Sequence, residues 1–235
     1  MDDWRDPELA QSWSGDPTQF NPLRVESLDV LITAIDAVFD PGKTLLDLGS
    51  GSGLVEVALF ERVEHAQVVG VDRSEPMMAL AKENLKPYPF RFIQVRHDLT
   101  DAAALAGPNS PLPRQAYQIA FSVQALHHLN REQHQAVYQA LASIIEPGGW
   151  FFNLDRMHVP EPLFEVYRAQ WARLERTHGF APDEGENYAA HQALLVRTGD
   201  APLALTEHLT LLAEAGFTAS VVYAYANRAL IAARK

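Results

Sequence analysis

Residues 45–53, LLDLGSGSG, decide the fold of this chain. A short apolar run that contains Asp47 leads into Gly49, Gly51 and Gly53, and the helical pattern LVEVALFERV follows. A buried strand, a glycine turn and a helix bring backbone N–H groups and a helix N-terminus to one point, and glycine lets a ligand approach the backbone closely. Taken alone, the turn fits a nucleotide site and a sterically tight connection equally well.

Apolar segments of strand length alternate with helical patterns along most of the chain. Strands are expected at 44–49, 67–72, 90–98, 117–123 and 149–155, with helices at 54–63, 77–85, 100–106 and 131–145. Ser74 is expected to cap the second of these helices, and Pro147 and Gly148 to end the fourth. Strands this apolar, alternating with helices, indicate a parallel sheet covered on both faces.

The C-terminal part of the chain predicts a different ending for the sheet. A helix with Thr206 as its cap and Gly216 as its stop precedes SVVYAYANRALIAAR, which has the pattern of two strands around a short turn at Ala226 and Asn227. The parallel sheet is therefore expected to end in an antiparallel hairpin.

Three parts of the chain are expected to have different roles. Residues 41–155 and 206–235 form the sheet domain, and residues 1–40 form an arm and a helix over 24–39 that act as a lid. Residues 156–205 show no strand pattern. Helices expected over 161–179 and 189–196 make this segment an insertion that covers one end of the sheet.

Composition narrows the classes of function. The chain has 235 residues, no cysteine and a formal net charge of −11, so disulfides, thiolate zinc sites and a cysteine nucleophile are excluded. An acidic surface without a basic patch repels phosphate backbones, so nucleic acid is not expected as a partner. The N-terminus lacks the pattern of a signal peptide, and no apolar run has the length of a membrane span. We expect a cytoplasmic protein that acts on a small molecule.

Two acids follow later strands at positions that suit a nucleotide. Asp72 ends the second expected strand, about 20 residues beyond the glycines, where an acid can accept from two ribose hydroxyls. Asp98 ends the third strand and can accept from an adenine amino group, or it can cap the short helix that follows.

The turn fits a dinucleotide poorly. The G-x-G-x-x-G fingerprint requires a small residue where this chain has Leu54, and Gly53 comes one residue early. Asp47 would lie close to a pyrophosphate and repel it, whereas a carboxylate there attracts a cationic or ammonium-bearing ligand.

Taken together, LLDLGSGSG, VVGVDRSEPMM, RHDL, AFSVQALHHL and LLAEAGF with its closing hairpin resemble the class I S-adenosylmethionine-dependent methyltransferases over about residues 40–235. The resemblance implies a Rossmann-like, seven-stranded, mostly parallel sheet with an antiparallel last strand and helices on both faces. It implies S-adenosylmethionine as cofactor, S-adenosylhomocysteine as product, and residues 156–205 as the variable part.

The resemblance also implies which residues contact the cofactor. The acid and glycines of the first motif hold its methionine end, the acid after the second strand holds the ribose, and the segments after the third and fourth strands border the adenine and the sulfonium. The expected contacts are Asp47, Gly49, Ser50, Gly51, Gly53, Asp72, Arg73, Met77, Asp98, Leu99, Ser122, Val123 and Gln124.

The segment after the fourth strand favours a small acceptor. Methyltransferases that act on amide or exocyclic nitrogens usually carry Asp or Asn, two prolines and an aromatic residue there, whereas this chain has SVQALHHL. This segment resembles the small-molecule branch, where HHL is common.

Methyl transfer by in-line displacement needs a base only if the acceptor loses a proton. His127 and His128 are the catalytic candidates, because histidine titrates near neutrality; the alternative is one packed and one solvated ring. No metal is expected, since no other histidine shows metal-ligand spacing. The expected acceptor contacts, of which Tyr167 and Trp171 fit a helix core as well, are Trp13, Phe20, Arg24, Asp155, Arg156, Tyr167 and Trp171.

Two alternatives stay open at this point. The first is an NAD(P)-dependent reductase, which Leu54 and the closing hairpin disfavour. The second is a non-catalytic module that keeps S-adenosylmethionine as a ligand, which no residue pattern separates from an enzyme.

Overall fold

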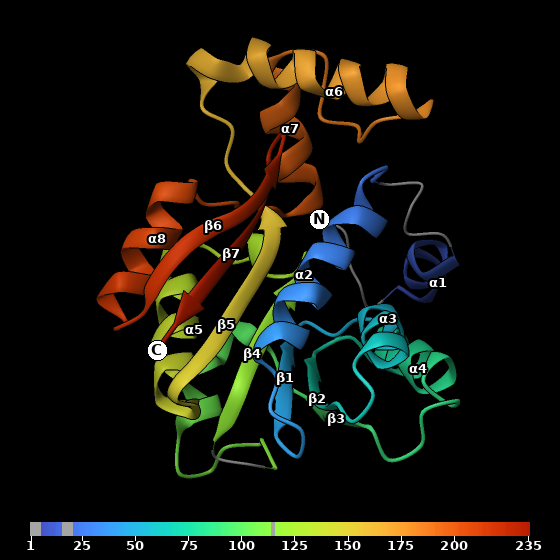
Figure 1. The fold of residues 1–235 in the computed structure, drawn as a ribbon. Helices are drawn as coiled ribbons and strands as arrows, with labels where there is room; N and C mark the ends of the chain where they lie inside the picture. The colour runs from blue at the N-terminus through green and yellow to red at the C-terminus, as the bar shows by residue number, and fades with distance from the viewer. Residues whose placement is uncertain (1–5, 16–20, 114–115) are drawn as a thin grey trace.

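Seven strands form one sheet at the centre of the molecule. The structure, a computed structural model, describes residues 6–15, 21–113 and 116–235. The strands are β1 (Thr44–Leu48), β2 (Gln67–Asp72), β3 (Phe92–Arg96), β4 (Tyr117–Val123), β5 (Ile145–Arg156), β6 (Thr218–Tyr225) and β7 (Arg228–Arg234). Their order across the sheet is β3-β2-β1-β4-β5-β7-β6 (Figure 1).

The directions of pairing confirm the predicted sheet. Strands β1 to β5 all pair in parallel, whereas β7 lies antiparallel to both of its neighbours, β5 and β6. Successive strands run outward from β1 to β3, and the chain then crosses back to place β4 on the other side of β1. In open sheets of this kind, ligands bind beyond the carboxyl ends of the strands at such a switch point.

Helices cover both faces of the sheet, as predicted. Helices α2 (Arg24–Val38), α3 (Leu54–Arg62) and α4 (Glu75–Asn84) pack on one face, and α5 (Arg131–Ile144), α8 (Leu205–Glu214) and the 3-10 helix η2 (Leu99–Ala106) pack on the other. Within β1, Leu45 joins the core layer of α2 and α3, and Leu46 joins the layer of α5 and α8. Successive side chains of a strand point to opposite faces, so every second residue of β1 faces α3.

Several helix signals in the sequence are confirmed. The Ser74 hydroxyl accepts a hydrogen bond from the Met77 N–H at 3.2 Å and caps α4. Helix α2 covers the expected segment, and the turn at Ala226 and Asn227 joins β6 to β7.

Two predicted boundaries are wrong. Helix α5 ends at Ile144 and β5 begins at the next residue, so Pro147 and Gly148 lie inside a strand. The register between β4 and β5 shifts there, and a proline without an N–H is tolerated in such an irregular stretch. Helix α8 begins at Leu205 rather than after a Thr206 cap, because the Glu207 carboxylate accepts from the Ala204 N–H at 3.0 Å.

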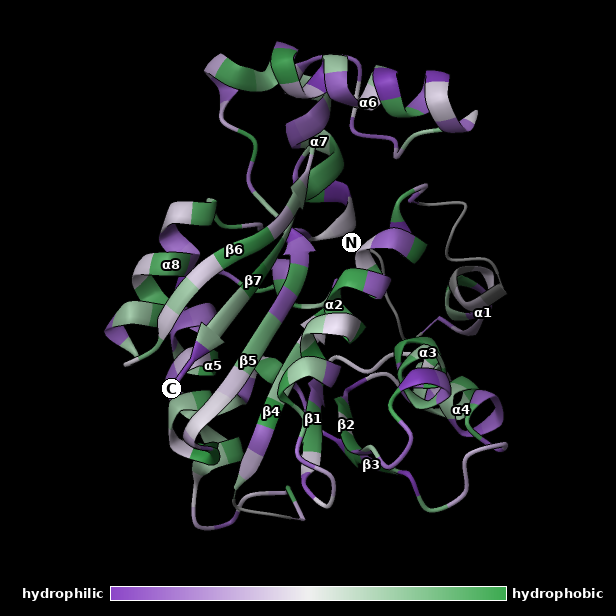
Figure 2. Cartoon of the chain, in the orientation of Figure 1, coloured by the Kyte–Doolittle hydropathy of each residue, from purple (hydrophilic) through white to green (hydrophobic). Residues whose placement is uncertain are grey.

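The segment after β5 forms a layer beyond the carboxyl end of that strand (Figure 1). The 3-10 turn η4 (Glu161–Leu163) leads into α6 (Phe164–His178), and α7 (Tyr188–Thr198) follows, close to the two expected helices. Many residues of α6 are hydrophilic (Figure 2). Phe164 and Trp171 on the inner side of α6 form a small separate core with Val159.

The N-terminal arm contains a helix that the sequence pattern does not predict. Helix α1 (Pro7–Gly15) packs against α4. Among the described helices, none combines the length and the apolar character of a membrane-spanning segment.

Candidate functional site

The glycine turn lies at the carboxyl end of β1, beside the switch point of the sheet. Gly49 has a φ of +83°, and a Cβ at this position would lie 2.3 Å from the Cβ of Ala125 in the turn after β4. Only glycine therefore allows the two turns to approach each other this closely. Gly51 has a φ of +53°, and a Cβ there would meet nothing within 4 Å, so the space above the turn is open to a ligand.

Asp72 fixes the shape of this turn from β2. Its Oδ2 accepts from the Gly51 N–H at 2.8 Å, and its Oδ1 accepts from the Ser74 N–H at 2.7 Å. Burial raises the pKa of Asp72, and these backbone N–H groups oppose that rise. Each carboxylate oxygen can accept more than one hydrogen bond, so Asp72 can bind ribose hydroxyls while it supports the turn.

A cavity of about 550 Å³ extends from the glycine turn to the inserted helices. The turns after β1 and β4 line one end of it, and the ends of β5 and α7 line the other. Nine residues predicted as site residues share its wall: Arg24, Gly49, Ser50, Met77, Val123, Gln124, His127, His128 and Arg156.

Other predicted cofactor residues lie outside the cavity wall. Asp47 is buried beneath the turn, and the Ser122 hydroxyl donates to the Leu48 carbonyl at 2.8 Å, which ties β4 to β1. Asp98 accepts from the Thr100 N–H at 3.0 Å and from Arg73 at 3.2 Å. It therefore caps η2, which was the alternative that the sequence allowed.

The partly buried His127 pairs with the buried Asp155 on the neighbouring strand. The His127 ring is placed by the 3-10 turn η3 (Leu126–His128) after β4, and Asp155 lies near the end of β5, one strand away. His127 Nδ1 lies 2.6 Å from Asp155 Oδ1, and the His127 N–H donates to Asp155 Oδ2 at 3.0 Å. Burial favours a higher pKa for Asp155, but the charge and hydrogen bond of His127 and the Arg156 N–H hold that pKa below its usual value. Asp155 is thus an anion that can accept the Nδ1 proton of His127, which leaves Nε2 as the ring nitrogen available to a ligand.

His128 and the inserted segment meet at Asp200. His128 Nδ1 lies 3.0 Å from Asp200 Oδ1, and an Arg156 guanidinium nitrogen lies 2.5 Å from Asp200 Oδ2. Burial and the neighbouring His127 lower the pKa of His128, so its ring is neutral at pH 7. The Ala201 N–H also donates to the His127 carbonyl at 2.6 Å, so the chain that leaves α7 is hydrogen-bonded to the turn that carries both histidines.

Glu184 joins the insertion to two strands. Its buried carboxylate pairs with Arg156 at the end of β5 and, at 3.0 Å, with Arg228 at the start of β7. Burial favours a higher pKa for Glu184, but the two guanidinium groups hold the pKa below its usual range. This network fixes the far wall of the cavity.

In the described part of the chain, His127, His128 and Asp200 offer ligand atoms within 4.8 Å of one another. Arg156 already supplies a positive charge to Asp200. The expectation of a site without metal stays a prediction.

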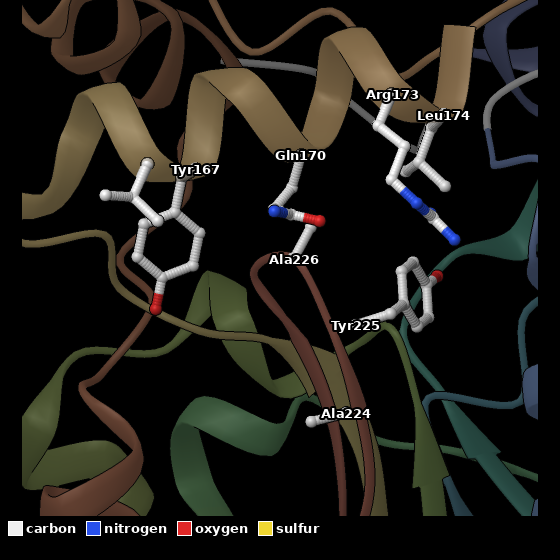
Figure 3. Close-up of a pocket in the computed structure, with 8 residues that line it drawn as sticks. Tyr167, Gln170, Arg173, Leu174, Ala224, Tyr225 and Ala226 are labelled. Carbon is white, nitrogen blue, oxygen red and sulfur yellow. The ribbon is translucent and has the colours of Figure 1, made fainter. Parts of the chain in front are cut away.

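A second cavity, of about 450 Å³, lies between α6 and the β6–β7 hairpin. Figure 3 shows Tyr167, Gln170 and Arg173 projecting from α6 toward the hairpin residues. Trp171 is buried in the small core, where its Nε1–H donates to Asn227 Oδ1 at 3.2 Å. Neither Tyr167 nor Trp171 therefore lines the cavity of His127. The Trp13 side chain and Phe20 lie outside the described residues.

Sequence analysis missed Glu184, Asp200 and Arg228, which line the main cavity. Glu184 and Asp200 occur in polar segments without periodicity, and Arg228 begins a strand whose pattern says nothing of a site; their partners are far away along the chain, so no local pattern marks them. Glu56 can be recognised from the sequence, because it is an acid among the apolar residues that form one face of a helix.

Comparisons with known proteins agree with this geometry. The family model described as a methyltransferase domain matches residues 45–149. The ubiquinone biosynthesis O-methyltransferase of Paraburkholderia xenovorans is 29% identical over 220 residues, which cover 88% of this chain and 89% of that protein. The demethylmenaquinone methyltransferase of Thermus thermophilus is 31% identical over 143 residues, 60% of each chain.

Solved structures support the fold. The crystal structure of a putative O-methyltransferase from Nostoc punctiforme superimposes with a TM-score of 0.65 at 16% identity, covering 99% of this chain and 60% of that one. The methyltransferase domain and the methyltransferase relatives favour methyl transfer over the reductase alternative. The sequence motifs, the strand order and the relatives point the same way: this chain is a methyltransferase, its residues 45–149 match a methyltransferase domain, and it is similar to the class I S-adenosylmethionine-dependent enzymes.

Proposed function

We propose that this methyltransferase transfers a methyl group to a hydroxyl oxygen of a small molecule, with His127 as general base. The observation that carries the proposal is the His127–Asp155 pair, whose ring lines the same cavity as the glycine turn. A hydroxyl acceptor has a proton to lose, which gives such a base a role. The relative from Paraburkholderia, an O-methyltransferase by name, points the same way.

The residues around the turn fit the cofactor. The open space above Gly51 lets the cofactor approach the backbone of the turn. The half-buried Asp72 carboxylate suits the ribose, and the Met77 side chain on the cavity wall suits the adenine. When bound, S-adenosylmethionine supplies a methyl group activated by a positively charged sulfur. The cavity wall holds the acceptor oxygen in line with that methyl group, and such positioning contributes roughly 7–11 kcal/mol in favourable cases.

His127 then takes the proton of the acceptor hydroxyl on Nε2. The charge that develops on the ring is stabilised by Asp155, which is already ionised and aligned with Nδ1. Residues 156–205 form the cap over the acceptor end of the cavity in this proposal, with Arg156 and Arg24 on its wall. The cavity size and the net charge of −11 favour a free small molecule over nucleic acid.

Cofactor binding is tested by thermal unfolding. We expect millimolar S-adenosylhomocysteine to raise the melting temperature by about 5–10 °C, which corresponds to saturation near 100 times Kd. Asp72→Ala should largely remove this shift, because the ribose loses its acceptor. Asp36→Ala, an exposed acid on α2, is the matched control and should keep it. A protein that NADH protects and S-adenosylhomocysteine does not would contradict the proposal.

Acceptor chemistry is tested with methyl-labelled S-adenosylmethionine and a panel of small acceptors that carry hydroxyl, amine or thiol groups. We expect label to appear on hydroxyl compounds. Turnover confined to amines or thiols would refute the hydroxyl proposal, and cofactor binding without turnover on the panel would favour a non-catalytic module.

A further inference from the structure

Glu56 lies on the apolar face of helix α3. Leu59, Phe60 and Val63 lie three, four and seven residues further on, so all four side chains share one face of the helix. That face packs into the core layer between α3 and the sheet, and Glu56 is 0% exposed there. Burying a carboxyl group on such a face lowers the stability of the fold unless the group is hydrogen-bonded or paired with a charge.

The partner that the fold provides is a second acid. Asp47 lies two residues after Leu45 on β1, so both side chains point into the layer of α3. Asp47 is 1% exposed, and its carboxyl group contacts that of Glu56. In the described part of the molecule, Asp47 Oδ1 and both carboxyl oxygens of Glu56 have no donor. The contact between the two carboxyls becomes a hydrogen bond only when one of them carries a proton.

The surroundings add negative charge rather than positive. Asp72, at the end of β2, acts on both carboxyls and raises their pKa values. The buried cation on α2, the helix packed against α3, is Arg24, whose pKa reflects its burial and the neighbouring Tyr225. No ion pair to Asp47 or Glu56 occurs among residues 6–15, 21–113 and 116–235.

We propose that Glu56 joins Asp47 as the second carboxyl of the site that holds the cofactor's ammonium group, and that this ammonium displaces a proton from the pair. The two acids lie on β1 and α3, the elements that flank the glycine turn, and Gly49, Ser50 and Ser52 of that turn line the main cavity. The positive charge of the ammonium group offsets the surplus negative charge of the two carboxyls, which are buried beneath the turn that lines the cavity. The inference rests on the proposed cofactor.

Protonation of the free pair makes the proposal measurable. Burial raises the pKa of Glu56 to about 7, and burial and Glu56 raise that of Asp47 well above its usual value. The pair therefore holds a proton in part of the molecules at pH 7 before the ligand binds. Between pH 4.5 and 7 the folded state binds a proton that the unfolded state does not, so the stability contributed by Glu56 falls as pH rises through this window.

Isothermal titration calorimetry in two buffers of different ionisation enthalpy counts the protons released on binding. For S-adenosylhomocysteine at pH 7 we expect a release of up to one proton per ligand, and a several-fold weaker affinity at pH 6 than at pH 8. An analogue with hydrogen in place of the amino group should release none. Glu56→Gln should abolish the release and flatten the pH dependence, while Glu61→Gln, an exposed acid on the same helix, should change neither.

The outcomes separate the two proposals. If S-adenosylhomocysteine does not bind at all, the proposed cofactor is wrong. If it binds, but the analogue without the amino group releases as many protons, the acid pair does not hold the ammonium. The analogue is tested on the unaltered protein, so this result stands even if Glu56→Gln fails to fold. Proton release that persists unchanged in folded Glu56→Gln would likewise overturn the role of Glu56.

Discussion

His127→Asn should lower the rate of methyl transfer by about 10²–10⁴-fold, the range that a positioned general base contributes. Asparagine places an N–H near the position of Nδ1, so the hydrogen bond to Asp155 is kept while the proton acceptor at Nε2 is lost. Affinity for S-adenosylhomocysteine should stay within about twofold, because no part of the proposed cofactor contact changes. Single-turnover rates with labelled cofactor at saturating concentration check this result.

His128→Asn is the matched variant for this experiment. The His128 ring lies against Asp200 and is neutral because burial and His127 lower its pKa, so we expect a loss of less than about tenfold. Equal losses in the two variants would assign the base to the pair rather than to His127. A His127→Asn protein that keeps the rate of the unaltered enzyme would show that methyl transfer here needs no base at this position.

Glu184→Ala should lower the free energy of unfolding by about 3–5 kcal/mol. The substitution removes the carboxylate that lies between the guanidinium groups of Arg156 and Arg228; Arg156 keeps its pair with Asp200, but the largely enclosed Arg228 loses its carboxylate partner. Uncompensated buried charge is among the few single-residue changes that cost this much. Urea unfolding measures the effect as a lower midpoint at an unchanged slope.

Glu165→Ala supplies the comparison, because Glu165 pairs with Arg168 on the exposed side of α6. An exposed pair of this kind is worth about 0–1 kcal/mol. If the two variants unfold at the same urea concentration, the Glu184 network does not hold the insertion to the sheet.

The sheet could be predicted because its signals are local. Each strand is an apolar run, each connection contains a glycine, proline or capping residue, and the hairpin at Ala226 shows both strands beside its turn. The two wrong boundaries have tertiary causes. Pro147 is tolerated within β5 because the register shifts there, so no ladder hydrogen bond is lost through its missing N–H. The side chain of Glu207, rather than that of Thr206, caps the start of α8.

The site could be predicted only in part, for a related reason. Gly49, Asp72 and His127 each lie at or shortly after the carboxyl end of a strand that the sequence predicts, so the strand pattern locates them. Asp200 reaches His128 because α7 turns back over the sheet, and Glu184 meets Arg228 across 44 residues. Contacts of this range depend on how the insertion folds, which no short motif records.

The backbone bond between Ala201 and His127 has a consequence for redesign of this enzyme. The inserted segment resembles a module that could be exchanged between relatives to change the acceptor. Its last residues, however, are hydrogen-bonded to the turn that carries the proposed base, so an exchange that stops before residue 200 brings in a foreign cap and keeps the native turn in place. An exchange that runs further replaces part of the catalytic apparatus itself, and altered acceptor preference would then come with altered chemistry.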